Sequence, residues 1–405
     1  MSSTVVSEVI IFIFRQMNVL FLSKWYPNKY DAMAGLFVRK HAQAAARVCD
    51  VTVMYVFTDP RIKLFEIYDE YIDGVREITV EYPSSPISWL HSLSSLINFL
   101  ISYYKGFKYL FKQLKWRPDV IHVNVLTRHG VIAYLVKKWY KIPYVITEHW
   151  SRYLSENFDY KGALKKCCTE LVARNAYCIM PVSQILADSM QQLGIKNHNY
   201  QVVTNVVDDY FFFLYPLGEY PKKRILHISC FDDKAKNVCG ILRSIKSLSQ
   251  RRCDFECFIV GTGPDFSMVT HYADELHLNG LVNFIGEQTP QEVSDWFYQS
   301  DFFVFFSNYE TAGVVLLESL TTGTPVITTP VGVAPMYINH TNGILVDVAN
   351  EQELADKMDF MLDHLHEFDA DFIRQDAPLC SYEAVGLQLK TIYEGARLSA
   401  KVKSV

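Results

Sequence analysis

Long apolar runs are scarce near the start of this 405-residue sequence. The longest one there covers residues 9–14, between Glu8 and Arg15, whereas a transmembrane helix needs about 20 apolar residues. A secretory signal requires positive charge before the run and a small-residue cleavage site after it, and neither is present. A buried-strand pattern starts directly after Met17. We therefore expect residues 1–16 to be an N-terminal extension outside the fold, with a mis-assigned start as the alternative.

A disulfide framework and a zinc site are also missing. The nine cysteines are an odd number, and several stand in apolar stretches, where a free thiol packs as a small hydrophobic group. The pair Cys253 and Cys257 has no second Cys or His pair at zinc-binding spacing. The sequence thus predicts free thiols in a reducing, cytoplasmic compartment and no bound metal.

Charge is unevenly divided along the chain. Residues 1–200 contain 24 Lys and Arg against 16 Asp and Glu, a net charge of +8, while residues 201–405 contain 15 against 28, a net charge of −13. A basic first half indicates an anionic partner, and nucleic acid, anionic lipid headgroups and phosphorylated substrates all fit at this level. Because half of the residues are apolar, a disordered chain is excluded.

Short apolar runs alternate with helical patterns along the chain, which predicts βαβ units on parallel sheets and an α/β fold. In the first half we expect strands at residues 18–23, 51–57, 119–123, 143–147 and 177–181, and helices at 36–48, 128–140 and 183–193. The second half repeats the pattern with strands at residues 224–229, 255–260, 281–285, 301–306 and 324–328. Two such series predict two Rossmann-like doubly wound domains, at 17–205 and 223–380. The linker is expected at 206–222, where Asp, Gly and Pro interrupt the pattern.

A basic amphipathic helix is predicted at residues 99–116. Its lysines recur at helical spacing on one face, and apolar residues fall on the opposite face: Lys105, Lys108, Lys112 and Lys115 against Leu100, Tyr103, Phe107, Leu110, Phe111 and Leu114. One interpretation is a surface helix that covers the sheet with solvated lysines. The other is a helix at an anionic membrane surface, which the flanking Trp89 and Trp116 favour.

The segment at residues 307–320 follows a buried strand and opens a helix. Gly313 permits close backbone approach, and the free N–H groups of the first turn, from Val314 on, make an anion site suited to a diphosphate. Glu310 precedes this helix and Glu318 lies inside it, so the two carboxylates can hold hydroxyls at either end of a nucleotide sugar. The alternative is a solvated Glu318 and a Glu310 that only favours the helix dipole.

Glu310 and Glu318, with seven residues between them and followed by Gly323-Thr324-Pro325-Val326 and Asn342-Gly343, resemble the E-x7-E signature of retaining family-4 glycosyltransferases. The resemblance covers about residues 17–397 in the family's order. It includes Lys24-Trp25-Tyr26-Pro27, Ala34-Gly35-Leu36-Phe37, Pro118-Asp119-Val120-Ile121-His122, Thr147-Glu148-His149-Trp150, His227-Ile228-Ser229 with Lys236-Asn237, and Val260-Gly261-Thr262-Gly263-Pro264.

The resemblance implies a GT-B architecture, in which two Rossmann-like domains face each other across a cleft. The first domain would bind the acceptor and the second the nucleotide-sugar donor, with a C-terminal helix at 381–397 crossing back onto the first. In the acceptor domain, Gly35 would let the backbone approach the donor diphosphate, and His149 would contact the donor sugar or the acceptor hydroxyl.

In the donor domain, the resemblance implies that Lys236 neutralises the departing diphosphate. Glu310 would hold sugar hydroxyls near the reacting carbon, and Glu318 the ribose hydroxyls. Lys236 and the helix start would replace a metal, because no Asp-x-Asp pair is placed to carry one.

The sequence departs from the family's pattern at two places. Cys230 stands where the family commonly has an Arg, and Lys234 is the residue that could compensate for the missing charge. Residues 331–336 read Val-Gly-Val-Ala-Pro-Met, with Val333 and Met336 in a segment where the family usually has Gly-Gly followed by Glu. Because the Glu pair and Lys236 are kept, the sequence favours an active enzyme with unusual donor contacts.

The expected function is transfer of a sugar, with retention, from a UDP- or GDP-sugar to a glycan or lipid-linked acceptor, without a cofactor. We expect no nucleic-acid partner, a cytoplasmic location, and peripheral contact with an anionic membrane through residues 99–116 as an open alternative. Two other functions stay open, namely a catalytically impaired binding protein of this fold and a nucleotide-sugar epimerase.

Overall fold

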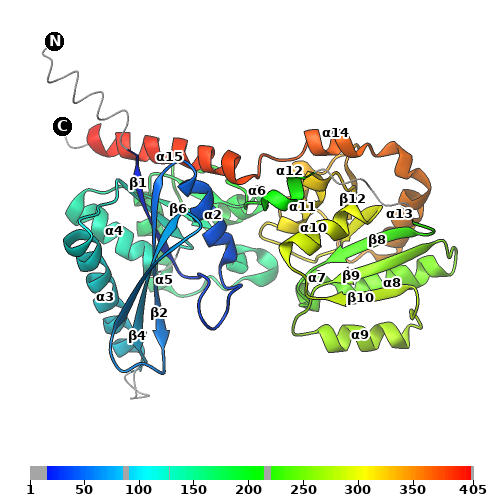
Figure 1. The fold of residues 1–405 in the computed structure, drawn as a ribbon, viewed down its shortest axis with the longest axis horizontal. Coiled ribbons are helices and arrows are strands. Elements are labelled where there is room, and N and C mark those ends of the chain that lie inside the picture. Colours follow the sequence, from blue (N-terminus) through cyan, green and yellow to red (C-terminus); the bar gives the residue numbers. More distant parts are fainter. Residues whose placement is uncertain (1–15, 85–90, 127, 214–219, 403–405) are drawn as a thin grey trace, which may run out of the picture.

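The computed structural model describes residues 16–84, 91–126, 128–213 and 220–402. Two α/β domains stand side by side, the N-terminal one on the left of Figure 1 and the C-terminal one on the right. The predicted fold class, with two parallel-sheet domains, is confirmed. The predicted extension at residues 1–16 lies outside the described residues except for Gln16.

The N-terminal sheet has the strand order β3-β4-β2-β1-β5-β6-β7. Its pairs are parallel except the one between β3 and β4, which is antiparallel. Its strands are β1 (Asn18–Ser23), β2 (Asp50–Asp59), β3 (Glu66–Ile72), β4 (Val75–Pro83), β5 (Val120–Asn124), β6 (Tyr144–Glu148) and β7 (Ile179–Pro181). The helices are α2 (Leu36–Ala46), α3 (His91–Lys108), α4 (Arg128–Tyr140), α5 (Ala163–Asn175) and α6 (Gln184–Gln192).

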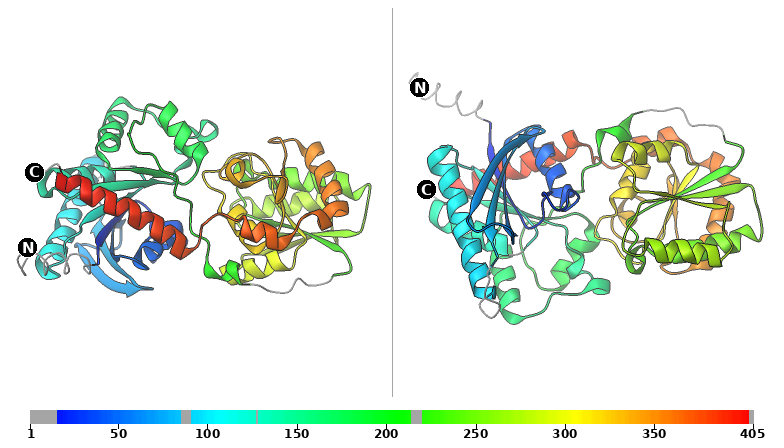
Figure 2. Two further views of the ribbon diagram at one scale, coloured as in Figure 1. Left: turned by 90° about the horizontal axis from the view of Figure 1, so that it is seen from above. Right: turned by 60° about the horizontal axis from the view of Figure 1, so that its bottom comes forward.

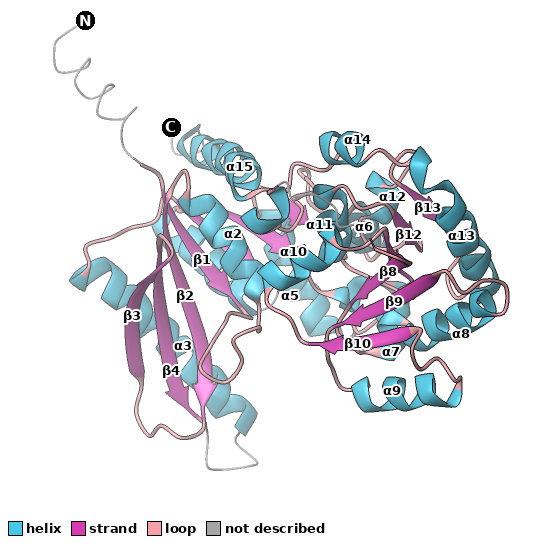
Figure 3. Ribbon diagram, turned by 45° about the vertical axis from the view of Figure 1, so that its right-hand side comes forward, coloured by secondary structure: helices cyan, strands magenta, loops and turns pink. Residues whose placement is uncertain are grey.

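The C-terminal sheet is parallel, in the order β10-β9-β8-β11-β12-β13. Its strands are β8 (Lys223–Ile228), β9 (Phe255–Val260), β10 (Val282–Gly286), β11 (Phe302–Phe305), β12 (Val326–Thr328) and β13 (Gly343–Leu345). The helices are α7 (Asp233–Lys236), α8 (Val238–Ser249), α9 (Phe266–Glu275), α10 (Pro290–Tyr298), α11 (Val314–Thr322), α12 (Ala334–Tyr337), α13 (Glu351–His364), α14 (Ala370–Gln375) and α15 (Tyr382–Val402). Figure 3 shows both sheets with helices around them.

Both faces of the N-terminal sheet are covered, as the continuous apolar strand β1 requires. Val19 and Phe21 pack in one core with residues of α2 and α15. Leu20 and Leu22 pack in the other core with residues of α3 and α4. The alternation follows from the two-residue period of a strand.

The last helix, α15, belongs spatially to the first domain. It runs along that domain in Figures 1 and 2 and packs against α2. A Cβ on Gly386 would come within 2.2 Å of the carbonyl oxygen of Ala44, so the two helix backbones touch there. Between the domains, the amide of Val207 donates to the carbonyl of Cys380 at 2.9 Å, which ties the two crossing segments together.

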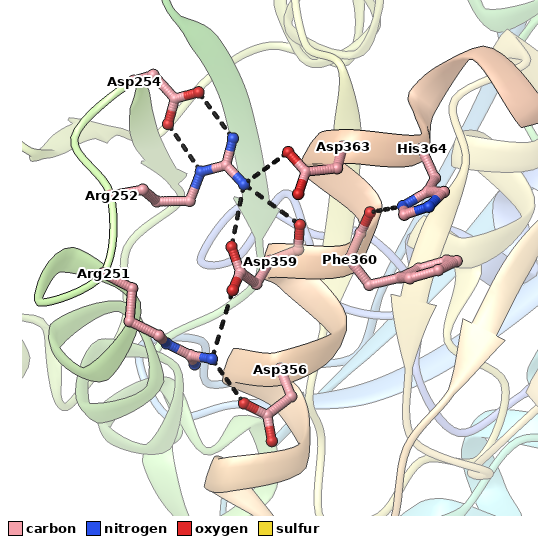
Figure 4. Close-up of polar contacts among 8 residues, drawn as sticks. All are labelled: Arg251, Arg252, Asp254, Asp356, Asp359, Phe360, Asp363 and His364. Carbon is pink, nitrogen blue, oxygen red and sulfur yellow. Dashed lines mark hydrogen bonds and ion pairs between the residues drawn. The ribbon is translucent and has the colours of Figure 1, made fainter.

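In the C-terminal domain, α13 is held to the turn after α8 by ion pairs (Figure 4). Arg252 pairs with Asp254 on its own loop and with Asp359 and Asp363 on α13. Arg251 pairs with Asp356 and Asp359 on α13. The aspartates on α13 face these arginines because they recur at helical spacing.

One predicted helix differs from the structure. The helix predicted at 99–116 is α3, which ends at Lys108 and continues as a π-helical turn over Tyr109–Gln113. Leu100, which we assigned to the face that covers the sheet, is 45% exposed. The π-helical turn shifts the spacing after Lys108, so one straight helical wheel does not describe the segment.

Candidate functional site

The loop after β11 carries Glu310 and lies against α7. Asn308 donates its backbone N–H to the carbonyl of Ala235 at 2.7 Å and its side-chain amide to the carbonyl of Lys234 at 2.9 Å. These bonds bring Glu310 to Lys236, and Nζ of Lys236 pairs with Oε1 of Glu310. Two predicted site residues that are 74 positions apart are therefore in direct contact.

The Lys236–Glu310 pair is mostly buried, with side-chain exposures of 16% and 11%. Burial disfavours the charge on Lys236, but Glu310, Cys230 and Asp232 together outweigh it, so the pKa of Lys236 is raised. Lys236 is thus a protonated cation at neutral pH. Ser307 also donates to Oε1 of Glu310, at 3.2 Å.

Gly313 caps α11 at its N-terminus in the left-handed conformation, with φ of 77°. Val314 begins the helix, so its first-turn N–H groups open onto the loop that holds Glu310. Gly332 packs against this loop: a Cβ there would come within 2.3 Å of the carbonyl oxygen of Ala312. Val333 donates its N–H to the same oxygen at 2.8 Å. The segment that departs from the family's pattern therefore still supports the loop through its single glycine.

Glu318 lies in the second turn of α11 and is partly buried. Burial raises its pKa to about 7, Lys40 acts in the opposite direction and Asp208 adds to the rise. Lys40 belongs to α2 of the first domain and pairs with Asp208 at 2.7 Å. Glu318 therefore faces charged groups from the other domain and from the linker.

Lys234 and Cys230 lie near Lys236 but differ from it in setting. Lys234 is exposed on α7, and its carbonyl oxygen is used by Asn308. The thiol of Cys230 is exposed and close enough to act on the charge of Lys236. The structure does not bring Lys234 into contact with Glu310, so its predicted role stays a prediction.

In the N-terminal domain, Gly35 caps α2 with φ of 64°. A Cβ at this position would come within 2.4 Å of the backbone of Trp25. Glycine is therefore required here by contact with the segment after β1, apart from any contact with a donor.

His149 follows β6 and is buried beside two residues of α2. Its ring centroid lies 4.4 Å from that of Phe37 and 5.4 Å from that of His41. Burial, and then the neighbouring His41 and His122, hold the pKa of His149 well below its usual value, and Asn205 only partly opposes this shift. His149 is therefore neutral. Neither of its ring nitrogens has a hydrogen-bond partner with normal geometry among the described residues.

The two halves of the site meet at the start of α6. Ser183 donates to the carbonyl of Thr311 at 2.5 Å, and the N–H of Gln184 points to Sδ of Met336 at 3.3 Å. Thr311 is the residue after Glu310, so the Glu310 loop is fixed to the first domain by this contact.

Sequence reasoning missed a group of cations in the N-terminal domain. Lys24, Arg128, Arg152 and Lys165 line one cavity at the carboxyl ends of β1, β5 and β6. Lys24 belongs to the motif around Trp25, and Arg152 follows the motif that ends at Trp150, which was the available signal. In the described part of the chain, no group of three or more His, Cys, Asp or Glu could hold a metal ion, and no helix is long and apolar enough to cross a membrane.

Both halves of the chain match known glycosyltransferase families. Residues 39–206 match the glycosyl transferase 4-like domain, and residues 217–376 match the glycosyl transferases group 1. N-acetyl-alpha-D-glucosaminyl L-malate synthase of Bacillus anthracis is 28% identical over 59% of this chain and 64% of its own length. The match thus spans slightly under two thirds of that relative.

Two solved structures share the fold. Sucrose-phosphate synthase from Thermosynechococcus elongatus superposes with a TM-score of 0.71 at 18% identity, covering 94% of this chain and 98% of its own. The Anabaena protein HepE, in complex with UDP and glucose, gives a TM-score of 0.69 at 16% identity, covering 93% and 99%. With two matched domains and this architecture, the chain belongs to the GT-B, family-4-like glycosyltransferases.

Proposed function

We propose that the protein transfers a sugar, with retention of anomeric configuration, from a UDP- or GDP-sugar to an acceptor hydroxyl in polysaccharide or lipid-linked glycan assembly. The observation that carries this proposal is the contact between Lys236 and Glu310 beside the glycine-capped start of α11. A cation, a carboxylate and free N–H groups are the three chemistries that a nucleotide sugar needs at its diphosphate and sugar.

The contact between Lys236 and Glu310 suggests an exchange when the donor binds. The donor diphosphate would take the place of Glu310 beside Lys236 and the N–H groups of α11, and Glu310 would turn to the sugar hydroxyls. Lys236 then stabilises the negative charge that grows on the departing diphosphate, an interaction stronger in the transition state than in the ground state. This chemistry uses no cofactor and no metal ion.

His149 and Glu318 are assigned to the two ends of the donor. Because His149 is neutral, we assign it a hydrogen bond to the sugar or to the acceptor hydroxyl, and no electrostatic role. Glu318 would accept hydrogen bonds from the ribose. Gly35, Lys234, Gly313 and Val314 complete the proposed set around the diphosphate.

The proposal is tested first by thermal unfolding with UDP, GDP, ADP and their sugars. A ligand that binds only the native state raises the unfolding midpoint, so one base is expected to stand out. NMR of the product then reports the anomeric configuration. Tight binding without release of nucleotide would favour the binding protein, and a new sugar on intact nucleotide would favour the epimerase. An inverted product would contradict the retaining mechanism.

A second proposal concerns location at an anionic membrane through α3. The helix lies on the side of the N-terminal domain away from the C-terminal domain (Figures 1 and 2). Its outer surface carries large apolar side chains that are 36–69% exposed: Leu96, Ile97, Leu100, Ile101 and Tyr104. Exposed lysines follow directly at Lys105, Lys108 and Lys112, with Lys115 beyond them. Apolar residues beside lysines on one surface suit insertion at the headgroups of anionic lipid.

Trp89 lies outside the described residues, and Trp116 is partly buried, with its indole N–H bonded to Asp50 at 2.8 Å.

The membrane proposal is tested by sedimentation with anionic and neutral vesicles. We expect the protein to pellet with anionic vesicles alone and to release with salt, because exposed charges are screened within about 10 Å at 0.1 M. The triple variant K105Q/K108Q/K112Q should lose binding, at about 1 kcal/mol per lysine. The matched control K161Q/K166Q/K196Q changes three exposed lysines elsewhere on the same domain and should bind like the wild type. Equal binding of both triple variants would refute the proposal.

A further inference from the structure

A cavity of about 560 Å³ lies at the carboxyl ends of β1, β5 and β6 in the N-terminal domain. Crevices at this edge of a parallel sheet are where α/β domains bind ligands. Its lining contains four cations, Lys24, Arg128, Arg152 and Lys165, and no carboxylate among the residues described there. Trp150, the residue after His149, forms part of the same wall, so the cavity adjoins the acceptor side of the proposed site.

Lys24 is held in this cavity by aromatic rings. Its Nζ lies 3.4 Å from the ring centroid of Trp150 and 4.4 Å from that of Trp25. No carboxylate pairs with this ammonium in the part of the chain that the structure describes. Burial and then the charge of Arg152 lower the pKa of Lys24 to about 8, and the carboxylate of Glu148 only partly opposes this shift. An anion placed beside Lys24 would relieve this cost and stabilise its charge.

Arg152 is more deeply placed, with 3% of its surface exposed. Its Nη2 donates to the carbonyl of Leu126 at 2.8 Å and to the hydroxyl of Tyr153 at 2.5 Å. Its Nε is buried and finds no acceptor among the described residues. A buried guanidinium with an unused donor is costly unless a further acceptor is supplied.

The nearest carboxylate does not supply that acceptor. Glu148 acts on the charges of Lys24 and Arg152, but it is fully buried beneath them and does not line the cavity. Its oxygens already accept the backbone N–H groups of Leu126 at 2.7 Å, His149 at 3.0 Å and Trp150 at 2.9 Å. The cavity therefore keeps an excess of positive charge.

We propose that this cavity binds a phosphate group of the acceptor, so that the enzyme selects phosphorylated acceptors. The inference rests on the proposed glycosyl transfer and adds the acceptor's chemical class. Phosphate oxygens suit the unused donors of Arg152, and the ammonium groups of Lys24 and Lys165 add charge around them. The phosphate can come from a soluble phosphorylated sugar or from an isoprenoid diphosphate-linked sugar.

The first test measures binding of inorganic phosphate to the full chain at ionic strength held constant with chloride. Phosphate is expected to raise the unfolding midpoint of the wild type, and K24Q should weaken this binding about ten-fold or more. K165Q should weaken it less, because Lys165 is exposed, and the matched control K166Q should not change it, because Lys166 lies outside the cavity. K236Q should keep the response if the phosphate is in this cavity. Equal responses of the wild type and K24Q would overturn the proposal.

The second test compares acceptors, using the nucleotide sugar that the binding panel selects. A soluble sugar phosphate, an isoprenoid diphosphate-linked sugar in detergent micelles and the unphosphorylated sugar are each offered to the wild type and to K24Q. We expect kcat/KM about ten-fold or more higher for a phosphorylated acceptor, and loss of this preference in K24Q. The better of the two phosphorylated acceptors identifies the source of the phosphate.

Two results of the acceptor comparison would overturn the inference. The first is equal use of the unphosphorylated sugar, and the second is a preference for phosphate that persists in K24Q. Failure of glycosyl transfer itself is distinguishable, because then the wild type would release no nucleotide with any acceptor, while the phosphate-binding comparison of the wild type and K24Q would still report on the cavity.

Discussion

The Lys236 site of the C-terminal domain and the Lys24 cavity of the N-terminal domain hold their cations in opposite ways. In the C-terminal domain, Lys236 is paired with Glu310 and the arginines at the end of α8 are paired with aspartates. In the N-terminal cavity, Lys24 and Arg152 have no carboxylate partner among the described residues. Under our proposals, Lys236 would exchange its partner when the donor binds, while Lys24 would gain one with the acceptor phosphate. The Lys24 cavity should therefore depend more on the charge of its ligand than the Lys236 site does, in agreement with the net charge of +8 in residues 1–200 and −13 in residues 201–405.

The largest expected effect comes from breaking the paired side. K236A and E310A should each lower kcat by about 10²–10³, because each removes a group that acts on the transition state. Steady-state kinetics at saturating donor measures this. The double variant should be little worse than either single one, since the two residues act as a unit. Wild-type rates in either folded variant would contradict the mechanism.

The same pair makes a second, structural prediction. Each single variant leaves its partly buried partner without a counter-charge, whereas K236M/E310Q removes both charges. We expect the single variants to lose about 1–3 kcal/mol of unfolding free energy and the double variant to lose less. Urea unfolding of the three variants checks the order.

A pair of glycine substitutions should separate the two halves. G332A would press on the carbonyl of Ala312 and so shift the Glu310 loop, while G35A would press on Trp25 and shift the wall of the Lys24 cavity. Both glycines have positive φ, which adds strain to the substitution. We expect G332A to lower kcat about ten-fold or more, since small displacements of reacting groups are costly. G35A should raise the KM for the acceptor more than it changes kcat. The reverse pattern would undo the assignment of the two halves.

Particular helices and strands show how much of the fold could be predicted from the sequence. The helix at 128–140 was predicted with the observed bounds. The β3–β4 hairpin was not predicted, because β3 is largely exposed and charged. Its Asp73-Gly74 turn, with φ of 47° and 83°, was the available signal. The three-residue strand β13 was not predicted either.

The sequence predicts the residues of the site only in part. Lys236 and Glu310 could be named from the resemblance, but their contact could not, because it depends on how Asn308 bonds to α7. The cationic cavity draws residues from segments that are far apart in sequence. Spacing along the chain carries no information about such a group, and only the strand order brings it together.

A smaller effect is expected at Glu318, whose pKa is raised to about 7 by burial. Because the unfolded chain loses this proton near pH 4.5, the unfolded state binds fewer protons between pH 4.5 and 7, and stability falls as the pH rises through that window. E318Q removes this cost. It should be more stable than the wild type at pH 8, on the order of 1–3 kcal/mol, and equal to it near pH 4.

The same variant should weaken nucleotide binding. If Glu318 holds the ribose, E318Q raises the KM for the donor about ten-fold and leaves kcat nearly unchanged, because ribose contacts are alike in ground and transition states. Thermal unfolding without ligand and kinetics with donor separate the two effects. A collapse of kcat at unchanged KM would reject the ribose role.

The smallest effect is expected in the arginine cluster of Figure 4, whose residues belong to neither proposed ligand site. Arg252 is 17% exposed and contacts Asp254 at 2.7 Å and Asp359 and Asp363 at 3.0 Å, whereas Arg251 is 36% exposed. R252A should therefore cost about 1 kcal/mol of unfolding free energy and R251A less.

Arg252 lowers the pKa of Asp254, so this stabilisation is present above the carboxyl's unfolded pKa and is lost as the pH falls through its folded value. Chemical unfolding at pH 7 and pH 3, in low and high salt, checks this, and both arginine variants should keep wild-type affinity for nucleotide. A larger loss in R251A than in R252A would show that burial does not set the strength of these pairs.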